Sequence, residues 1–218
     1  TMFHEMGHGL HGMLSDVNYP TLAGTSVSRD YVEFPSTFEE DWAAHPDVIA
    51  NYAKQYETGE PIPEALLEKV IRSRTFNMGY DTLEYMSAAL LDMEWHSISA
   101  DQAPEDIQAF EAQALDKHNV GLSYVPPRYK SAFFAHSMGG GYAAGYYAYM
   151  WSEILAADAF AYMQELGGLK LENGMKYRKE ILSTGNSRPP MESYKAFRGK
   201  APTTDALLIR RGLKTKLD

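Results

Sequence analysis

The sequence predicts a mostly α-helical fold. Alternation of apolar and polar residues, the pattern of a half-buried strand, does not extend over any useful length. Apolar residues instead recur at helical spacing, most clearly over residues 79–96. The core-like positions of that segment are Leu83, Met86, Leu90, Leu91 and Trp95. With 218 residues, 44% of them hydrophobic, the chain is long enough to form one compact domain with a sizeable core.

Composition excludes several classes of function. The formal net charge of −9 and the lack of a basic cluster argue against nucleic acid as a partner. No run of eighteen apolar residues occurs, so no membrane partner is expected either. The chain has no cysteine, which excludes disulfides and thiol chemistry and leaves the redox compartment open. The compartment expected is the cytoplasm, with the periplasm as the alternative.

Turn signals divide the chain into its expected helices. The predicted helical ranges are 2–15, from residue 28 or 30 to about 55, 63–75, 79–96, 105–117 and 143–164, followed by short helices and loops. Pro35 is tolerated in a helix only in the first turn unless it kinks the axis. Glu33 is therefore expected close to the N-terminus of the second helix or beside a kink. No repeat or linker divides the chain into domains.

The first predicted helix carries the pattern H-E-x-x-H as His4, Glu5 and His8. Residues four apart lie on one face of a helix, so both imidazoles can reach one metal ion while Glu5 flanks it. The alternative is two histidines on a polar helix face. A catalytic zinc site also needs a third protein ligand and an open fourth position. Glu33 is the candidate, although spacing alone does not choose it over the acids at positions 39–41.

A resemblance to a known family favours Glu33 as the third ligand. The string FHEMGHGLHGMLSDVNYPTLAGTSVSRDYVEFPS, residues 3–36, closely resembles the thimet oligopeptidase/dipeptidyl carboxypeptidase family of zinc metallopeptidases. The string FRGKAPTTDALLIRRGL, residues 197–213, is also similar, and the resemblance covers nearly the whole chain. It implies one Zn²⁺ bound by His4, His8 and Glu33. It also implies a multi-helical, zincin-type catalytic domain with the metal site between two helices.

The second informative stretch, FFAHSMGGGYAAGYYAYMWSEILAADAF, contains three consecutive glycines. Such a loop can move over a bound peptide. The resemblance implies that His136, Tyr142, Tyr146 and Tyr149 contact substrate or stabilise the transition state, and that Gly140 and Gly141 line the substrate site. Tyr146 and Tyr149, three apart on the expected helix, would share a face.

Two alternatives exist for this stretch. The tyrosines could be ordinary core aromatics, which suits Tyr147 better than Tyr146. Gly139, Gly141 and Ala144 also fit the dinucleotide pattern G-x-G-x-x-A, but that site needs a preceding strand, and residues 128–138 are no convincing strand.

Three further polar residues near the motif have less specific roles. His11 is expected to be packed, or to support a ligand, rather than to bind metal. Asp30 could orient a ligand histidine or simply be an acid at a helix N-terminus. Arg29 could meet a substrate carboxylate or a surface acid.

The predicted function is zinc-dependent hydrolysis of short peptides, with Glu5 as general base and water as nucleophile. Two segments, GTSVSRDYVEFPS and AHSMGGGYAAGYYAYMW, look more like those of dipeptidyl carboxypeptidase, which implies release of C-terminal dipeptides. An oligopeptidase of the same family is the alternative.

The chain starts at Thr1 with no capping residue before the motif, so residues 1–218 are expected to be the C-terminal catalytic part of a longer protein. The expected partner is an N-terminal helical region, in the same precursor or as a separate chain. A fragment that binds zinc but is inactive without that region is a further alternative.

Overall fold

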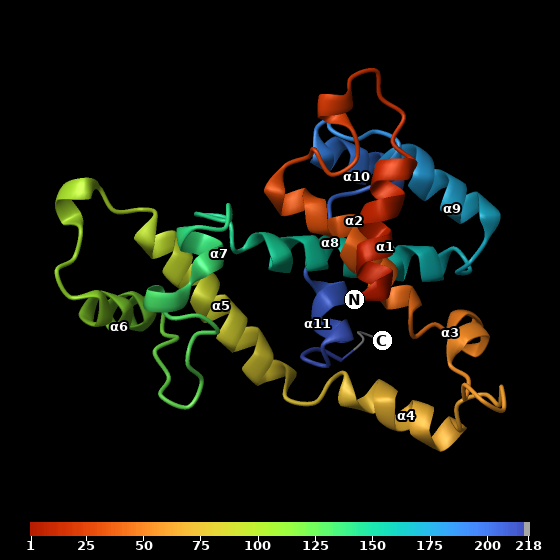
Figure 1. The fold of residues 1–218 in the computed structure, drawn as a ribbon, viewed down its shortest axis with the longest axis horizontal. Helices are drawn as coiled ribbons and strands as arrows, with labels where there is room; N and C mark the ends of the chain where they lie inside the picture. Colours follow the sequence, from red (N-terminus) through yellow and green to blue (C-terminus); the bar gives the residue numbers. More distant parts are fainter. Residues whose placement is uncertain (216–218) are drawn as a thin grey trace. The chain divides into compact units, whose positions relative to one another are not determined.

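The computed structural model describes residues 1–215 and confirms a mostly α-helical fold (Figure 1). Within these residues no β-strand occurs, only an isolated antiparallel bridge between Lys54 and Pro61. None of the described helices is both long and apolar enough to cross a bilayer.

The chain forms two compact units where the sequence predicted one compact domain. The first unit comprises Thr1–Phe76 and the chain from Met150, and the second comprises Asn77–Tyr149. The physical reason is that the buried apolar side chains gather in separate clusters, one in the first unit and two in the second. In the sequence, the second unit is inserted between the two segments of the first, and such an insertion does not require a long linker.

The helices of the first unit are α1 (Met2–Met13), α2 (Arg29–Trp42), α3 (Pro46–Tyr52), α4 (Glu64–Ser73), α9 (Leu171–Tyr177), α10 (Pro190–Arg198) and α11 (Asp205–Arg210). Those of the second unit are α5 (Met78–Trp95), α6 (Ile107–Lys117) and α7 (Ala135–Met138). Helix α8 (Ala148–Glu165) begins in the second unit and continues in the first. The ranges predicted for α4, α5 and α6 are confirmed to within two residues at each end, and the short helices of the last third are also confirmed.

Helix α2 is the centre of the first unit. Ten of its 14 residues are buried. Phe38 stacks on Tyr177 with ring centroids 4.4 Å apart, and Phe34 packs edge-on against Tyr194 at 5.6 Å. Such aromatic contacts add to the free energy gained by burying the rings. They hold α2 rigidly, and with it the backbone that carries Glu33.

The second helix is shorter than predicted. It ends at Trp42, and α3 begins separately at Pro46. The reason is that the residue before a proline is driven out of the α region, and His45 accordingly has an extended backbone with ψ of 134°. Pro35 lies in the second turn of α2 rather than the first, where it supplies no N–H to the Tyr31 carbonyl.

Helix α8 starts at Ala148, five residues later than predicted. Ala144 has a φ of 52°, in the left-handed region, and this conformation cannot be part of a right-handed helix. Tyr146 therefore lies in the turns before α8, and the prediction that it shares a helix face with Tyr149 was wrong.

Helices α1 and α2 pack against each other very closely at Gly7. A Cβ atom on Gly7 would lie 2.6 Å from the Ser36 Cα and 2.8 Å from the Pro35 carbonyl oxygen, both backbone atoms of α2. Since backbone atoms cannot move aside as a flexible side chain can, only glycine fits here.

We expect Gly7→Ala to destabilise the first unit by about 1–3 kcal/mol, because the added methyl group must force α1 away from α2. Gly9→Ala is the matched control, since its Cβ would meet only methionine side-chain atoms at 3.9 Å. That variant should be neutral or slightly more stable, as alanine is the better helix former. Chemical denaturation measures both. Equal stabilities of the two variants would contradict the close approach.

Candidate metal centre

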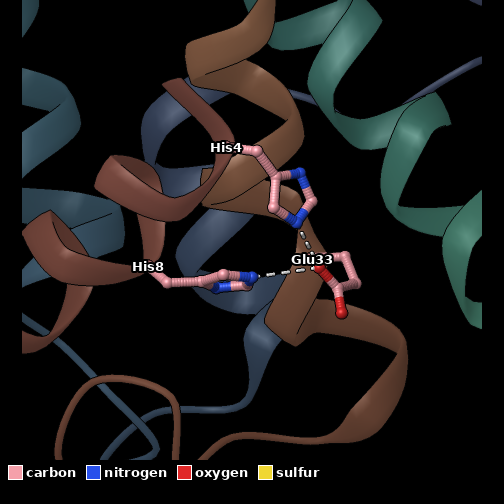
Figure 2. A group of neighbouring side chains, drawn as sticks. All are labelled: His4, His8 and Glu33. Carbon is pink, nitrogen blue, oxygen red and sulfur yellow. Dashed lines mark ion pairs between the residues drawn. The ribbon is translucent and has the colours of Figure 1, made fainter. Parts of the chain in front are cut away.

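Three side chains from α1 and α2 converge on one point (Figure 2). The Nε2 atoms of His4 and His8 lie 3.3 Å and 3.2 Å from the same carboxylate oxygen, Oε2 of Glu33. One ligand atom from each residue can be chosen so that all three lie within 4.8 Å of one another. The two imidazole rings are nearly perpendicular, at 84°, with centroids 4.9 Å apart.

The arrangement fits a zinc ion. Ligand atoms about 2.0–2.1 Å from a tetrahedral zinc lie about 3.3–3.4 Å from one another. The two nitrogen–oxygen separations of 3.3 Å and 3.2 Å agree with that value. Two imidazoles and one carboxylate are also a donor set that catalytic zinc uses, with one position left for water.

Each candidate ligand is positioned by its helix. His4 and His8 are one turn apart on α1, and Gly7 between them lets this helix approach α2. Glu33 is 7% exposed on α2. The Ser36 hydroxyl, three residues further along α2, donates to the Glu33 carbonyl at 3.0 Å and lies 3.1 Å from its Oε2. These contacts keep the carboxylate turned toward α1.

A second carboxylate orients His4. Its Nδ1 lies 2.6 Å from Oε1 of Glu40, which directs the opposite nitrogen, Nε2, toward Glu33. A carboxylate on the far nitrogen of a ligand histidine fixes the tautomer and strengthens the ligand. The sequence analysis considered Asp30 for this role, but the structure places Glu40 there.

Glu39 and Asp41, two further acids of α2, are not among the three clustered residues. Burial raises the pKa of Glu39 to about 7. Asp41 accepts a hydrogen bond from Arg210 at 2.8 Å and is buried with it. Of the four acids that spacing left open, Glu33 is therefore the one that the structure brings to both histidines.

The charges of the site act on His8. Its pKa is raised, mainly by the hydrogen bond to Glu33, and the negative charges of Glu33 and Glu5 act in the same direction while burial opposes them. A metal ion must displace the proton that this pairing favours. Glu5 itself is exposed on α1, beside the three ligand candidates but not among them.

His11 is packed inside the first unit, one of the two roles predicted for it. Its side chain is fully buried, neither ring nitrogen has a hydrogen-bond partner, and its pKa is lowered to about 4 by burial and by His8. It is therefore neutral and does not join the cluster. Arg29, also in this unit, is exposed at the first position of α2.

The four aromatic residues predicted to contact substrate form one cluster in the second unit. The His136 ring lies 6.0 Å from that of Tyr142, 5.7 Å from that of Tyr146 and 6.4 Å from that of Tyr149. Tyr142 stacks on Tyr149 at 5.1 Å. Of the neighbouring glycines, Gly141 has a φ of 82°, and a Cβ on Gly140 would lie 3.0 Å from backbone atoms of α7.

Burial within this cluster differs from the expectation. Tyr146 is only 4% exposed and Tyr147 is 41% exposed, so Tyr146 is the core aromatic of the two. Burial raises the pKa of Tyr146 to about 12, which keeps its hydroxyl protonated and able to donate.

Residues 128–138 form a short turn at Ser131–Phe133 and α7, not a strand, which contradicts the dinucleotide alternative.

Comparison with known proteins identifies the family. The model of peptidase family M3 matches residues 1–213. The chain belongs to this family. It is 49% identical over 213 residues to dipeptidyl carboxypeptidase of Escherichia coli, 39% identical over 218 residues to oligopeptidase A of the same organism, and 32% identical over 216 residues to saccharolysin of Saccharomyces cerevisiae. Each match covers 98% of this chain but only 30–32% of the relative. The chain therefore spans about a third of the length of these relatives.

The sequence offered Glu40 only as an alternative ligand and did not predict its contact with His4 or the contact of Ser36 with Glu33, although helical spacing could have indicated both. Glu40 and Ser36 follow Glu33 by seven and three residues and therefore share its face of α2. Any carboxylate on that face was a candidate to reach α1.

We expect a graded loss of zinc affinity in two variants and none in a third. Glu33→Ala should lose the most, because it removes a ligand. Glu40→Gln should lose about tenfold, because an amide still accepts from Nδ1 of His4 but carries no charge. Glu39→Gln is the matched control and should bind zinc like the wild type. Competition with a chromophoric chelator measures all three. Full zinc occupancy in Glu33→Ala would exclude Glu33 as a ligand.

Proposed function

We propose that this chain is the catalytic part of a zinc-dependent peptidase that hydrolyses short peptides. His4, His8 and Glu33 would hold the ion. The observation that carries the proposal is the convergence of two Nε2 atoms on one buried carboxylate oxygen, at separations that suit tetrahedral zinc. Membership of peptidase family M3 supports it.

When bound, zinc lowers the pKa of water and polarises a carbonyl group. In the proposed mechanism the carboxylate of Glu5 accepts a proton from the attacking water and then delivers it to the nitrogen of the leaving amine. Glu5 follows ligand His4 directly in the sequence and is exposed, so its carboxylate can reach solvent and substrate. Water attacks directly, so no acyl-enzyme forms.

The aromatic cluster of the second unit would supply hydrogen-bond donors. His136, Tyr142, Tyr146 and Tyr149 are the proposed donors to substrate and to the oxygen on which charge develops. Loss of one such donor typically costs about a hundred- to a thousandfold in rate. The four rings lie in one cluster, with the His136 ring 5.7–6.4 Å from each of the three tyrosine rings, and this supports a shared role. Gly140, Gly141 and Arg29 are proposed to contact the substrate.

The finer proposal is release of C-terminal dipeptides. It is supported by the higher identity to dipeptidyl carboxypeptidase, 49%, than to oligopeptidase A, 39%.

Because those relatives are about three times as long, the remaining region, in the same precursor or as a separate chain, is the proposed partner. The proposed compartment is the one predicted from the sequence: the cytoplasm, with the periplasm as the alternative.

We expect Glu5→Gln in the full-length protein to keep its zinc and to lose turnover by at least about a hundredfold, because the amide cannot accept the proton. Glu68→Gln, an exposed glutamate on α4, is the control and should keep wild-type activity. Cleavage of a quenched fluorescent peptide and metal analysis report the two quantities separately. Normal turnover in zinc-loaded Glu5→Gln would exclude Glu5 as the base.

The dipeptide proposal predicts that a peptide with a free C-terminus is cleaved two residues from its end, and that amidation of that C-terminus blocks cleavage. Removing the terminal negative charge leaves the group that binds it without a partner. Mass spectrometry of the products distinguishes the outcomes. Equal cleavage of both peptides at an internal bond would favour an oligopeptidase.

A further inference from the structure

Asp92, near the end of α5, is fully buried in the second unit. Three hydrogen-bond donors and the ring of His96 surround its carboxylate. Oδ1 accepts from the Ser137 hydroxyl at 2.5 Å and from the Ala144 N–H at 3.1 Å, and Oδ2 accepts from the Tyr146 N–H at 3.0 Å. Nδ1 of His96 lies 3.0 Å from Oδ1. Charge-assisted hydrogen bonds of this kind are about twice as strong as neutral ones.

The three donors lie on both sides of the consecutive glycines, with Ser137 in α7 and the other two in the turns before α8. Ser137 precedes the glycines at 139–141, and Ala144 and Tyr146 follow them. One side chain of α5 therefore ties together both ends of the segment that contains the glycines and Tyr142. We call residues 137–146 the glycine loop.

Other contacts also shape the glycine loop, since the Tyr142 N–H donates to the His136 carbonyl and the Gly145 N–H to the Tyr142 carbonyl, but Asp92 is the side chain that joins both ends of the loop. Consecutive glycines lose more backbone freedom on ordering than other residues do. Ala144 in addition adopts a φ of 52°, which is unfavourable for an L-residue with a Cβ. The hydrogen bond from the Ala144 N–H to Asp92 therefore stabilises an otherwise unfavourable backbone conformation.

The anchor acts directly on the aromatic cluster. The N–H of Tyr146 donates to Asp92, and its carbonyl accepts from the Tyr85 hydroxyl. Held on both sides, the Tyr146 backbone sets its ring against Tyr85 and Phe134, at centroid distances of 5.1 Å and 4.8 Å. The ring of His136 then packs on that of Tyr146.

We propose that Asp92 is a positioning residue for the reaction: its buried carboxylate fixes the glycine loop in the one conformation that presents His136, Tyr142 and Tyr146 together. The inference rests on the proposed peptidase function, because that function makes these side chains donors to substrate. Asp92 itself touches neither substrate nor metal in this scheme.

The test is Asp92→Asn in the zinc-loaded full-length protein. An amide nitrogen in place of one carboxylate oxygen must face at least one of the loop's N–H or O–H donors, whichever way the amide is turned. We expect kcat to fall by up to about a hundredfold, the cost of a misplacement of about 1 Å, with less change in KM and unchanged zinc content. Hydrogen exchange should accelerate in residues 139–146 and stay unchanged in α1 and α2.

Two variants separate positioning from general stability. Asp158→Asn alters another buried acid, which accepts from Tyr194 at 2.6 Å and from Arg198 at 3.0 Å in the first unit. It should lower the melting temperature but leave kcat and exchange of the glycine loop unchanged. Ser137→Ala removes one donor and keeps both backbone contacts, so its loss of kcat should be smaller than that of Asp92→Asn.

Each outcome decides the proposal. A lower kcat together with faster loop exchange supports it, and either change without the other overturns it. If Asp92→Asn does not fold, exchange in the wild type remains decisive, because fast exchange of the Ala144 and Tyr146 amides would exclude the anchor. A zinc-loaded wild type that cleaves no peptide would instead overturn the proposed function, and the exchange data would still show whether Asp92 fixes the loop.

Discussion

The candidate metal centre depends on the close approach of α1 to α2 at Gly7. One backbone lies against the other there, with no room for a Cβ atom. This contact brings histidines from the first helix within 3.3 Å of a carboxylate oxygen on the second, although 25 residues separate His8 from Glu33. Side chains at ordinary helix-packing distances of 8–10 Å would have to extend further and would be less firmly held.

The burial of Glu33 makes the site electrostatically demanding. A buried carboxylate without a positive or hydrogen-bonding partner costs several kcal/mol. Ser36 and the two histidines supply such partners, and the raised pKa of His8 shows that this carboxylate favours the positive form of the imidazole. A divalent cation would satisfy the same carboxylate without a proton. The same features that stabilise the protonated pair therefore favour metal binding as the pH rises.

The sequence predicted the parts of this protein that local patterns encode. The helical class, most helix ranges and the place of His4, His8 and Glu33 near one another followed from periodicity, the H-E-x-x-H spacing and the family resemblance. The errors arose where backbone conformation overrode periodicity: Pro46 ended α2 early, and Ala144 delayed α8. The burial of Tyr146 also escaped prediction, because it depends on Tyr85 and Phe134, which are distant in the sequence and reveal nothing about Tyr146 locally.

Two buried acids illustrate how the fold holds functional side chains. In the first unit Glu33 faces both histidines directly, and in the second Asp92 receives three hydrogen bonds from the loop that carries the aromatic cluster. In both cases the carboxylate projects from a helix with a well-packed core, so its position varies little. In the first unit the close packing of α1 on α2 adds to the contacts of the carboxylate, and in the second unit the hydrogen bonds to Asp92 add to the packing of the Tyr146 ring. Under the proposed function, a loop with three consecutive glycines would thereby present one conformation to a peptide, because the carboxylate that anchors it belongs to α5 and not to the loop itself.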